Sequence, residues 1–113
     1  MHEVGIMQNA LEIALDRAGR EGATRIRQIK MRVGALSGVV PEALEFAFEV
    51  VARGTMAEGA RLDIDQIPVL CFCPACSLEF QPVDLCCECP RCSQPSAEIR
   101  GGRELELASL EVT

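Results

Sequence analysis

All seven cysteines of this 113-residue chain lie between Cys71 and Cys92, and the first 70 residues contain none. A disulfide framework would normally spread its bridges through the fold, use an even number of cysteines and follow a secretory signal peptide. The chain opens with neither the basic nor the apolar region of such a signal. We therefore expect a cytoplasmic protein, kept reduced, in which the cysteine cluster binds metal.

The cysteine spacing predicts a tetrahedral metal site. Two Cys-x-x-Cys units, at 73–76 and 89–92, are separated by twelve residues, and each has proline in its second position. Such a turn directs two thiolates at one ion, and two turns complete a four-sulfur shell that suits Zn²⁺. A thioredoxin-like redox pair would need only one unit, and four thiolates could hold an iron–sulfur cluster, but the matched spacing favours zinc. The expected zinc ligands are Cys73, Cys76, Cys89 and Cys92.

Three cysteines are surplus to this four-ligand site: Cys71, Cys86 and Cys87. We expect them to be reduced bystanders close to the metal. A sharper alternative, which the spacing does not demand, is that one of them exchanges into the metal shell.

The apolar periodicity predicts two helices. Over residues 6–18 apolar side chains recur every three or four positions, with polar residues between them. A second stripe of the same kind covers residues 44–51. Pro41 stands at the expected first helical position of that segment, and Gly54 closes it. We expect both stripes to be core.

Alternating apolar and polar residues predict three strands, at residues 29–33, 62–67 and 105–112. Within the last strand, Ala108-Ser109 shifts the alternation and predicts a β-bulge. Residues 34–38 are expected to form a flexible turn, and residues 100–103 the return connection from the cysteine block.

The order of these elements predicts an α/β (α+β) protein in which two helices pack on a small three-stranded sheet. The cysteine block interrupts this arrangement as an inserted, zinc-ribbon-like module. We expect an α/β domain at 1–68 plus 102–113 and an inserted zinc-binding domain at 69–101. The insert has little apolar surface to bury, so its folding should depend on metal.

The composition disfavours several classes of function. Eleven Lys and Arg against seventeen Asp and Glu give a net charge of −6, and the chain has no Trp or Tyr, so we expect no binding to nucleic acid. No apolar run approaches the ~18 residues of a membrane span. With a single histidine no Ser/His/Asp or Cys/His set can be assembled, and no glycine-rich phosphate loop is present, so we expect no enzyme.

That single histidine stands at position 2. The Met1 amine, the backbone nitrogen of residue 2 and the His2 imidazole could close adjacent chelate rings on one ion, and Glu3 could add an oxygen. Nitrogen-rich, square-planar coordination favours Ni(II) or Cu(II). The alternative is a frayed terminus that binds nothing.

Several stretches of the chain resemble one family. They are Met1-His2-Glu3, residues 32–39, residues 41–44 with 46–49, residues 54–55 with 57–60, and the two Cys-x-x-Cys units. Together they look like the HypA family of nickel metallochaperones for hydrogenase maturation. The resemblance covers essentially the whole chain, and it is the combination of the paired cysteine units with the N-terminal Met-His-Glu that is specific.

The resemblance implies a protein that delivers Ni(II) to the precursor of the [NiFe]-hydrogenase large subunit, working with a nickel-handling GTPase. His2 corresponds to the family's nickel ligand, Glu3 to its neighbour, and the four cysteines to its zinc ligands. Cys86 and Cys87 depart from the family's four-cysteine pattern. Supply of nickel to urease and association into a weak homodimer stay open. The alternative from another class is a zinc-ribbon adaptor for protein interactions, without a nickel function.

Overall fold

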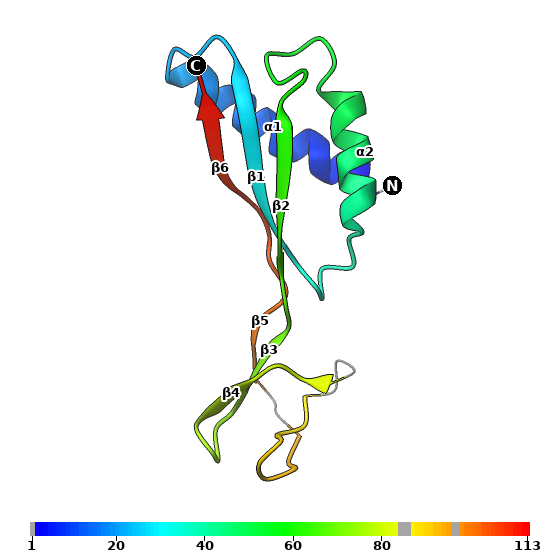
Figure 1. Ribbon diagram of the computed structural model, residues 1–113, viewed down its shortest axis with the longest axis vertical. Coiled ribbons are helices and arrows are strands. Elements are labelled where there is room, and N and C mark those ends of the chain that lie inside the picture. The colour runs from blue at the N-terminus through cyan, green and yellow to red at the C-terminus, as the bar shows by residue number, and fades with distance from the viewer. Residues whose placement is uncertain (1, 84–86, 96–97) are drawn as a thin grey trace.

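The computed structural model describes residues 2–83, 87–95 and 98–113, which form two helices and two small sheets (Figure 1). The helices are α1 (His2–Arg20) and α2 (Pro41–Val51). The strands are β1 (Ile26–Gly34), β2 (Arg61–Ile67), β3 (Leu70–Cys73), β4 (Leu78–Phe80), β5 (Glu98–Gly101) and β6 (Leu105–Val112). The predicted fold class, with two helices on a three-stranded sheet and an inserted cysteine module, is confirmed.

The first sheet has the strand order β2-β1-β6. β1 is parallel to β2, with α2 in the connection between them, and antiparallel to β6. Along the second pair Lys30 lies opposite Ser109, whereas Met31 lies opposite Leu107. Ala108 is therefore the extra residue, and the predicted bulge is confirmed.

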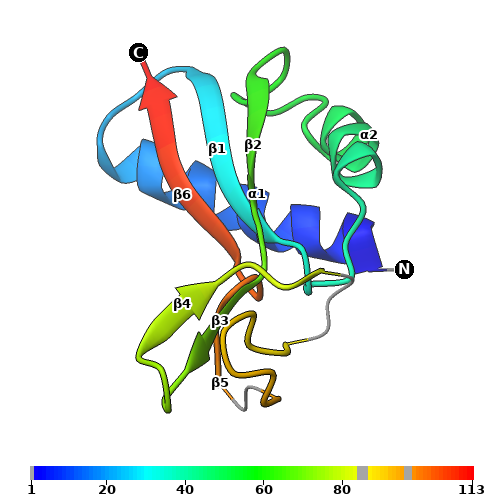
Figure 2. The ribbon, with the colours of Figure 1, turned by 60° about the horizontal axis from the view of Figure 1, so that its bottom comes forward.

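One face of this sheet is covered by the helices. Figure 2 shows α1 crossing behind the strands and α2 lying beside β2. In β1 the apolar residues of the predicted alternation, Ile29, Met31 and Val33, are buried, because their side chains all point to the helix side. The helices add buried residues from both predicted stripes: Met7, Ala10, Leu11, Ala14, Ala18, Leu44, Ala47 and Phe48.

Helix α1 is longer than its apolar stripe. The stripe runs over residues 6–18, but the helix begins at His2 and ends at Arg20. Glu3 lies in the first turn and Arg17 and Arg20 in the last turn, where their charges match the helix dipole. An apolar stripe records only the part of a helix that contacts the core. It therefore underestimates the length of a helix that extends beyond those contacts.

The second sheet, of order β4-β3-β5, carries the cysteine module. Its small core consists of Val69, Cys71, Cys73, Phe80 and Cys89, all buried. On the other face the guanidinium of Arg100 lies 3.6 Å from the ring centre of Phe72. It also pairs with Glu79 and Glu98 at the surface, where ion pairs add little stability.

The two sheets meet at the turn after β1. The amides of Gly34 and Leu36 donate 2.6 Å hydrogen bonds to the carbonyls of Glu104 and Gly102, and the Ala35 amide donates to Ile67 at 2.9 Å. The Leu36 side chain packs on the core of the second sheet. The first three residues of the turn expected to be flexible are thus bonded to the end of β2 and to the connection from β5 to β6.

The second sheet extends from one end of the first, so the molecule is elongated, with extents of 54 × 27 × 17 Å (Figure 1). Neither helix of the described chain has both the length and the apolar character required to cross a bilayer.

Candidate metal centre

The four cysteines of the two Cys-x-x-Cys units come together in the module. Their sulfur atoms all lie within 4.8 Å of one another. The Sγ atoms of Cys73 and Cys92 are 3.7 Å apart, and those of Cys76 and Cys89 are 4.0 Å apart. An ion ~2.3 Å from four sulfurs in a tetrahedron requires sulfur separations of about 3.8 Å. The cluster therefore fits a thiolate-bound ion such as Zn²⁺.

The first unit is held by a hairpin. Cys73 ends β3 and is paired with Leu78 at the start of β4, so the intervening turn brings Cys76 back toward Cys73. Ser77 completes that turn with a left-handed φ of 50°. A non-glycine residue adopts this conformation only at a local cost, which the hairpin pairing and the shared cluster offset.

The second unit repeats this design without a hairpin. The Cys89 amide donates to the Gln94 carbonyl, and the Ser93 amide donates to the Cys89 carbonyl, both at 2.9 Å. Ser93 has a left-handed φ of 64° and follows its unit as Ser77 follows the first. The role of these two serines was not anticipated, although the repeated Cys-Pro-x-Cys-Ser pattern is visible in the sequence.

Three of the four clustered thiols have shifted pKa values. A hydrogen bond from the Cys92 amide, helped by one from Arg91, outweighs burial and lowers the pKa of Cys89 to about 7. Burial and hydrogen bonds with the other cluster thiols raise the pKa of Cys76 to about 12. For Cys92 a hydrogen bond from the Gln94 amide lowers the pKa, but partial loss of hydration and hydrogen bonds with the Cys73 and Cys89 thiols outweigh it, and the net shift is upward. Cys89 thus ionises more readily than Cys76 or Cys92, and an incoming cation must displace protons from those two thiols.

Burial of the cluster is graded. Cys73 and Cys89, the first residue of each unit, are buried, whereas Cys76 is half-buried and Cys92 is exposed. The site is therefore anchored in the small core on one side and open to solvent on the Cys92 side.

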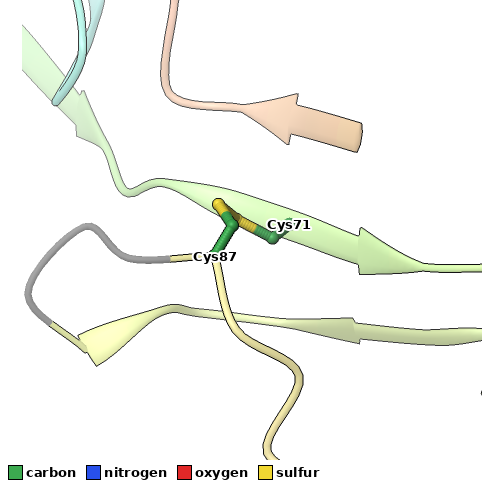
Figure 3. Close-up of a disulfide and its surroundings, with 2 residues drawn as sticks. All are labelled: Cys71 and Cys87. Carbon is green, nitrogen blue, oxygen red and sulfur yellow. A yellow bond between two sulfur atoms is a disulfide. The ribbon is translucent and has the colours of Figure 1, made fainter. Parts of the chain in front are cut away.

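Two of the surplus cysteines form a disulfide. Cys71 and Cys87 are bonded through their sulfur atoms, with Cα atoms 6.0 Å apart (Figure 3). The expectation that both are reduced bystanders is wrong. Cys71 lies in the core of the module, and the segment that leads to the second Cys-x-x-Cys unit brings Cys87 against the same core. Cys86 lies outside the described residues. The sequence signal for this pairing is that each of the two stands two positions before the first cysteine of a unit.

At the other predicted site the structure positions only part of the ligand set. His2 and Glu3 occupy the first turn of α1, and Glu3 is half-buried. Met1, whose amine belongs to the predicted chelate, lies outside the described residues. The nickel ligands stay a prediction.

The chain matches one family model along almost its whole length. Residues 1–112 fit the model described as "Hydrogenase/urease nickel incorporation, metallochaperone, hypA". Among curated proteins, the chain is 55% identical over 112 residues to "Hydrogenase maturation factor HypA" of Picosynechococcus sp., covering 99% of both chains. It is 44% identical to the protein of the same description from Geobacter sulfurreducens, again over 99% of each chain.

Solved structures show the same fold. The chain superposes on "Solution structure of HypA protein" with a TM-score of 0.76 at 27% identity, covering 100% of this chain and 97% of that one. It superposes on "Solution structure of the Ni metallochaperone HypA from Helicobacter pylori" with a TM-score of 0.66 at 25% identity, covering 99% and 97%.

Proposed function

This chain belongs to the HypA family of hydrogenase/urease nickel incorporation metallochaperones, and we propose that it binds one Ni(II) ion at its N-terminus and delivers it to the precursor of a [NiFe]-hydrogenase large subunit. The observation that carries the proposal is the match over residues 1–112, which includes both the N-terminal His2-Glu3 pair and all four clustered cysteines. In this role nickel is cargo, and the protein catalyses no reaction.

The proposed nickel ligands are the Met1 amine, the backbone nitrogen of His2 and the His2 imidazole, with Glu3 as a neighbouring oxygen donor. The position of His2 at the start of α1 supports this set. The first N–H groups of a helix have no acceptor within the helix, so the His2 backbone nitrogen is not committed to a helical hydrogen bond. Nitrogen-rich coordination of this kind suits Ni(II).

The same position favours release. The N-terminus of a helix carries a partial positive charge, which opposes a bound cation by roughly 0.3–1 kcal/mol. The Glu3 carboxylate in the first turn acts in the opposite direction. Modest affinity follows, which is what a carrier needs in order to transfer its ion to a client.

The four-cysteine cluster is the proposed structural Zn(II) site. When bound, zinc supplies a cross-link between the two Cys-x-x-Cys units. Cys73 and Cys89 anchor the site in the small core, and Cys76 and Cys92 complete the shell. This resident ion is distinct from the nickel cargo, because four thiolates hold zinc far more firmly than a terminal nitrogen chelate holds nickel. The corresponding inserted domain spans 69–101, and the nickel-binding domain spans 1–68 and 102–113.

The proposed partners are proteins of the maturation pathway: a nickel-handling GTPase and the hydrogenase large-subunit precursor, met in the cytoplasm. The net charge of −6 supports protein partners over nucleic acid, whose phosphates would be repelled.

Nickel titration tests the proposal. The wild-type protein should bind one Ni(II), whereas His2→Ala and a form extended by residues ahead of Met1 should bind much more weakly. Affinity should fall as the pH drops, because the imidazole and the amine then gain protons. Glu21→Ala, at an exposed position beyond the far end of α1, is the matched control and should bind as the wild type does.

Equal nickel binding by all these forms would place the chelate elsewhere. No nickel binding by the wild type would favour the zinc-ribbon adaptor instead.

A further inference from the structure

The disulfide between Cys71 and Cys87 joins equivalent points of the two metal-binding units. Each cysteine stands two residues before the first cysteine of its unit, so the module contains Cys-x-Cys-x-x-Cys twice. The disulfide and the four-cysteine cluster therefore connect the same two arms of the module, which are the segments 71–76 and 87–92.

The environment of the two cysteines differs. Cys71 lies in β3, is fully buried, and belongs to the core of the second sheet. Cys87 lies on the segment leading to the second unit and is half-buried against the same core (Figure 3). Their Cα separation of 6.0 Å falls within the range in which a disulfide forms without backbone movement.

We propose that the Cys71–Cys87 pair is a redox latch that keeps the cysteine module assembled when the four-cysteine site holds no metal. With the pair oxidised, the arms stay together whether or not an ion is bound. With the pair reduced, assembly of the module depends on metal.

Chain entropy gives the expected size of the effect. The disulfide closes a loop of 16 residues in sequence separation. Closing a loop of about this length favours the assembled state by a factor on the order of 100. An ion bound by Cys73, Cys76, Cys89 and Cys92 already closes the same loop. The latch should therefore matter greatly in the metal-free protein and little in the metal-loaded protein.

The latch closes by thiol–disulfide exchange with a small-molecule disulfide, RSSR. The Cys87 thiolate is the more accessible of the two, so it attacks one sulfur of RSSR, forming a mixed disulfide and releasing one RS⁻. The Cys71 thiolate then attacks the Cys87 sulfur and releases the second RS⁻. The two cysteine sulfurs lose two electrons in total, RSSR gains two, and the two thiol protons pass to the departing thiolates.

The latch rests on the proposed metal site only in the comparison with zinc present. If the cluster held no ion, that comparison would be lost, but the oxidised and reduced metal-free forms would still differ. Failure of the latch and failure of the zinc assignment are thus distinguishable.

The experiment compares four states of the full chain: equilibrated with glutathione disulfide or with reduced glutathione, each with zinc and after removal of zinc by a chelator. Amide NMR signals of Phe80 and Ile99 report on the module, and that of Ile29 reports on the first sheet. We expect the module signals to persist in three states and to be lost in the reduced, metal-free state, with Ile29 unchanged throughout.

Variants separate the pair from its neighbours. Cys87→Ser should lose the module signals without zinc under either redox condition, and Cys71→Ala repeats the test with a substitution that leaves no unpaired hydroxyl in the core. Cys86→Ser is the control and should behave as the wild type does.

Two results would overturn the latch. One is peptide mapping that finds no Cys71–Cys87 linkage in the glutathione-disulfide sample. The other is loss of the module signals at the same chelator concentration in the oxidised and reduced wild type.

Discussion

A β-carbon added to Gly34 would lie 2.1 Å from the carbonyl oxygen of Gly102. That carbonyl accepts the hydrogen bond from the Leu36 amide, so it cannot retreat without breaking the contact between the two sheets. Gly102 itself has a φ of +114°, a conformation that side chains rarely adopt. The connection between the sheets therefore depends on the absence of side chains at both positions.

Gly34→Ala should destabilise the protein by about 3 kcal/mol, because the clash is with backbone and not with a side chain that can rotate away. Denaturant unfolding followed by circular dichroism measures this. Gly19→Ala is the matched control: it lies in α1 with nothing within 4 Å of its added β-carbon, and should stabilise by ~0.5–1 kcal/mol. A Gly34→Ala protein as stable as the wild type would contradict the close approach.

Leu36→Ala should loosen the module from the first sheet. The Leu36 side chain, in the turn after β1, packs against the core of the second sheet. We expect a loss of about 1–2 kcal/mol, since the side chain is only half-buried. In ¹⁵N relaxation the module should tumble more independently. Leu15→Ala, also half-buried but packed on the first core, should lower stability without changing the relative tumbling.

Glu104 should make stability depend on pH. Hydrogen bonds from its own amide and from the Gly102 amide, the latter at 2.8 Å, lower the pKa of its carboxyl, helped by the charge of Arg32. Because the folded pKa lies below the ordinary value of 4.5, the ionised carboxylate stabilises the fold above that value. The contribution is lost as the pH falls through the folded pKa.

Glu104→Gln should therefore lower the free energy of unfolding near neutral pH, and the difference from the wild type should vanish in acid. Urea titrations at several pH values measure it. Glu106→Gln removes an exposed ion pair with Arg32 and serves as control, with a loss below about 0.5 kcal/mol. A loss for Glu104→Gln that persists unchanged at the lowest pH would disprove the assigned shift.

Replacement of Cys92 by Ser should release zinc while leaving the first sheet folded. Cys92 is the exposed member of the cluster, so its substitution removes a thiolate without opening a cavity in the core. Metal analysis should give one zinc per wild-type chain and much less in the variant, and X-ray absorption of the wild type should show sulfur at ~2.3 Å. Gln81→Ala, at an exposed position of the module outside both Cys-x-x-Cys units, is the control and should retain zinc.

Zinc retention should also rise with pH across the neutral range. The pKa of Cys89 is about 7 and that of Cys76 about 12, so binding must displace protons that are more abundant at low pH. Competition with a chelator of known pH dependence measures the trend. Affinity independent of pH between 6 and 8 (about one unit either side of neutral) would argue against thiolate ligands.

Much of the first sheet was predictable because its signals are periodic. Alternation located β1, β2 and β6, and a break in that alternation located the bulge at Ala108. The ends of α1 were not predictable in the same way. Glu3, Val4 and Gly5 are not buried, so no apolar repeat in the sequence indicates that they are helical.

The cysteine module was predictable in chemistry but not in structure. The spacing predicted which four cysteines cluster, because a Cys-x-x-Cys turn is formed by residues adjacent in the sequence. The Cys71–Cys87 pairing depends on how β3 lies against a segment 16 residues later, which only the packed module decides. The strands β4 and β5 are three and four residues long, too short for an alternation to be recognised.

The insertion of the module between β2 and β6 also affects the order of folding. Met31 of β1 pairs with Leu107 of β6, so the whole module lies inside the loop that this pairing closes. When the module is assembled, Leu70 lies beside Gly101, and the ends of the insert are held together. The loop left to close is then little more than half as long, which should speed the search for the last strand by roughly twofold. A chain whose module is not yet closed would leave one edge of β1 without its partner for longer, and an unpaired edge invites association with other chains.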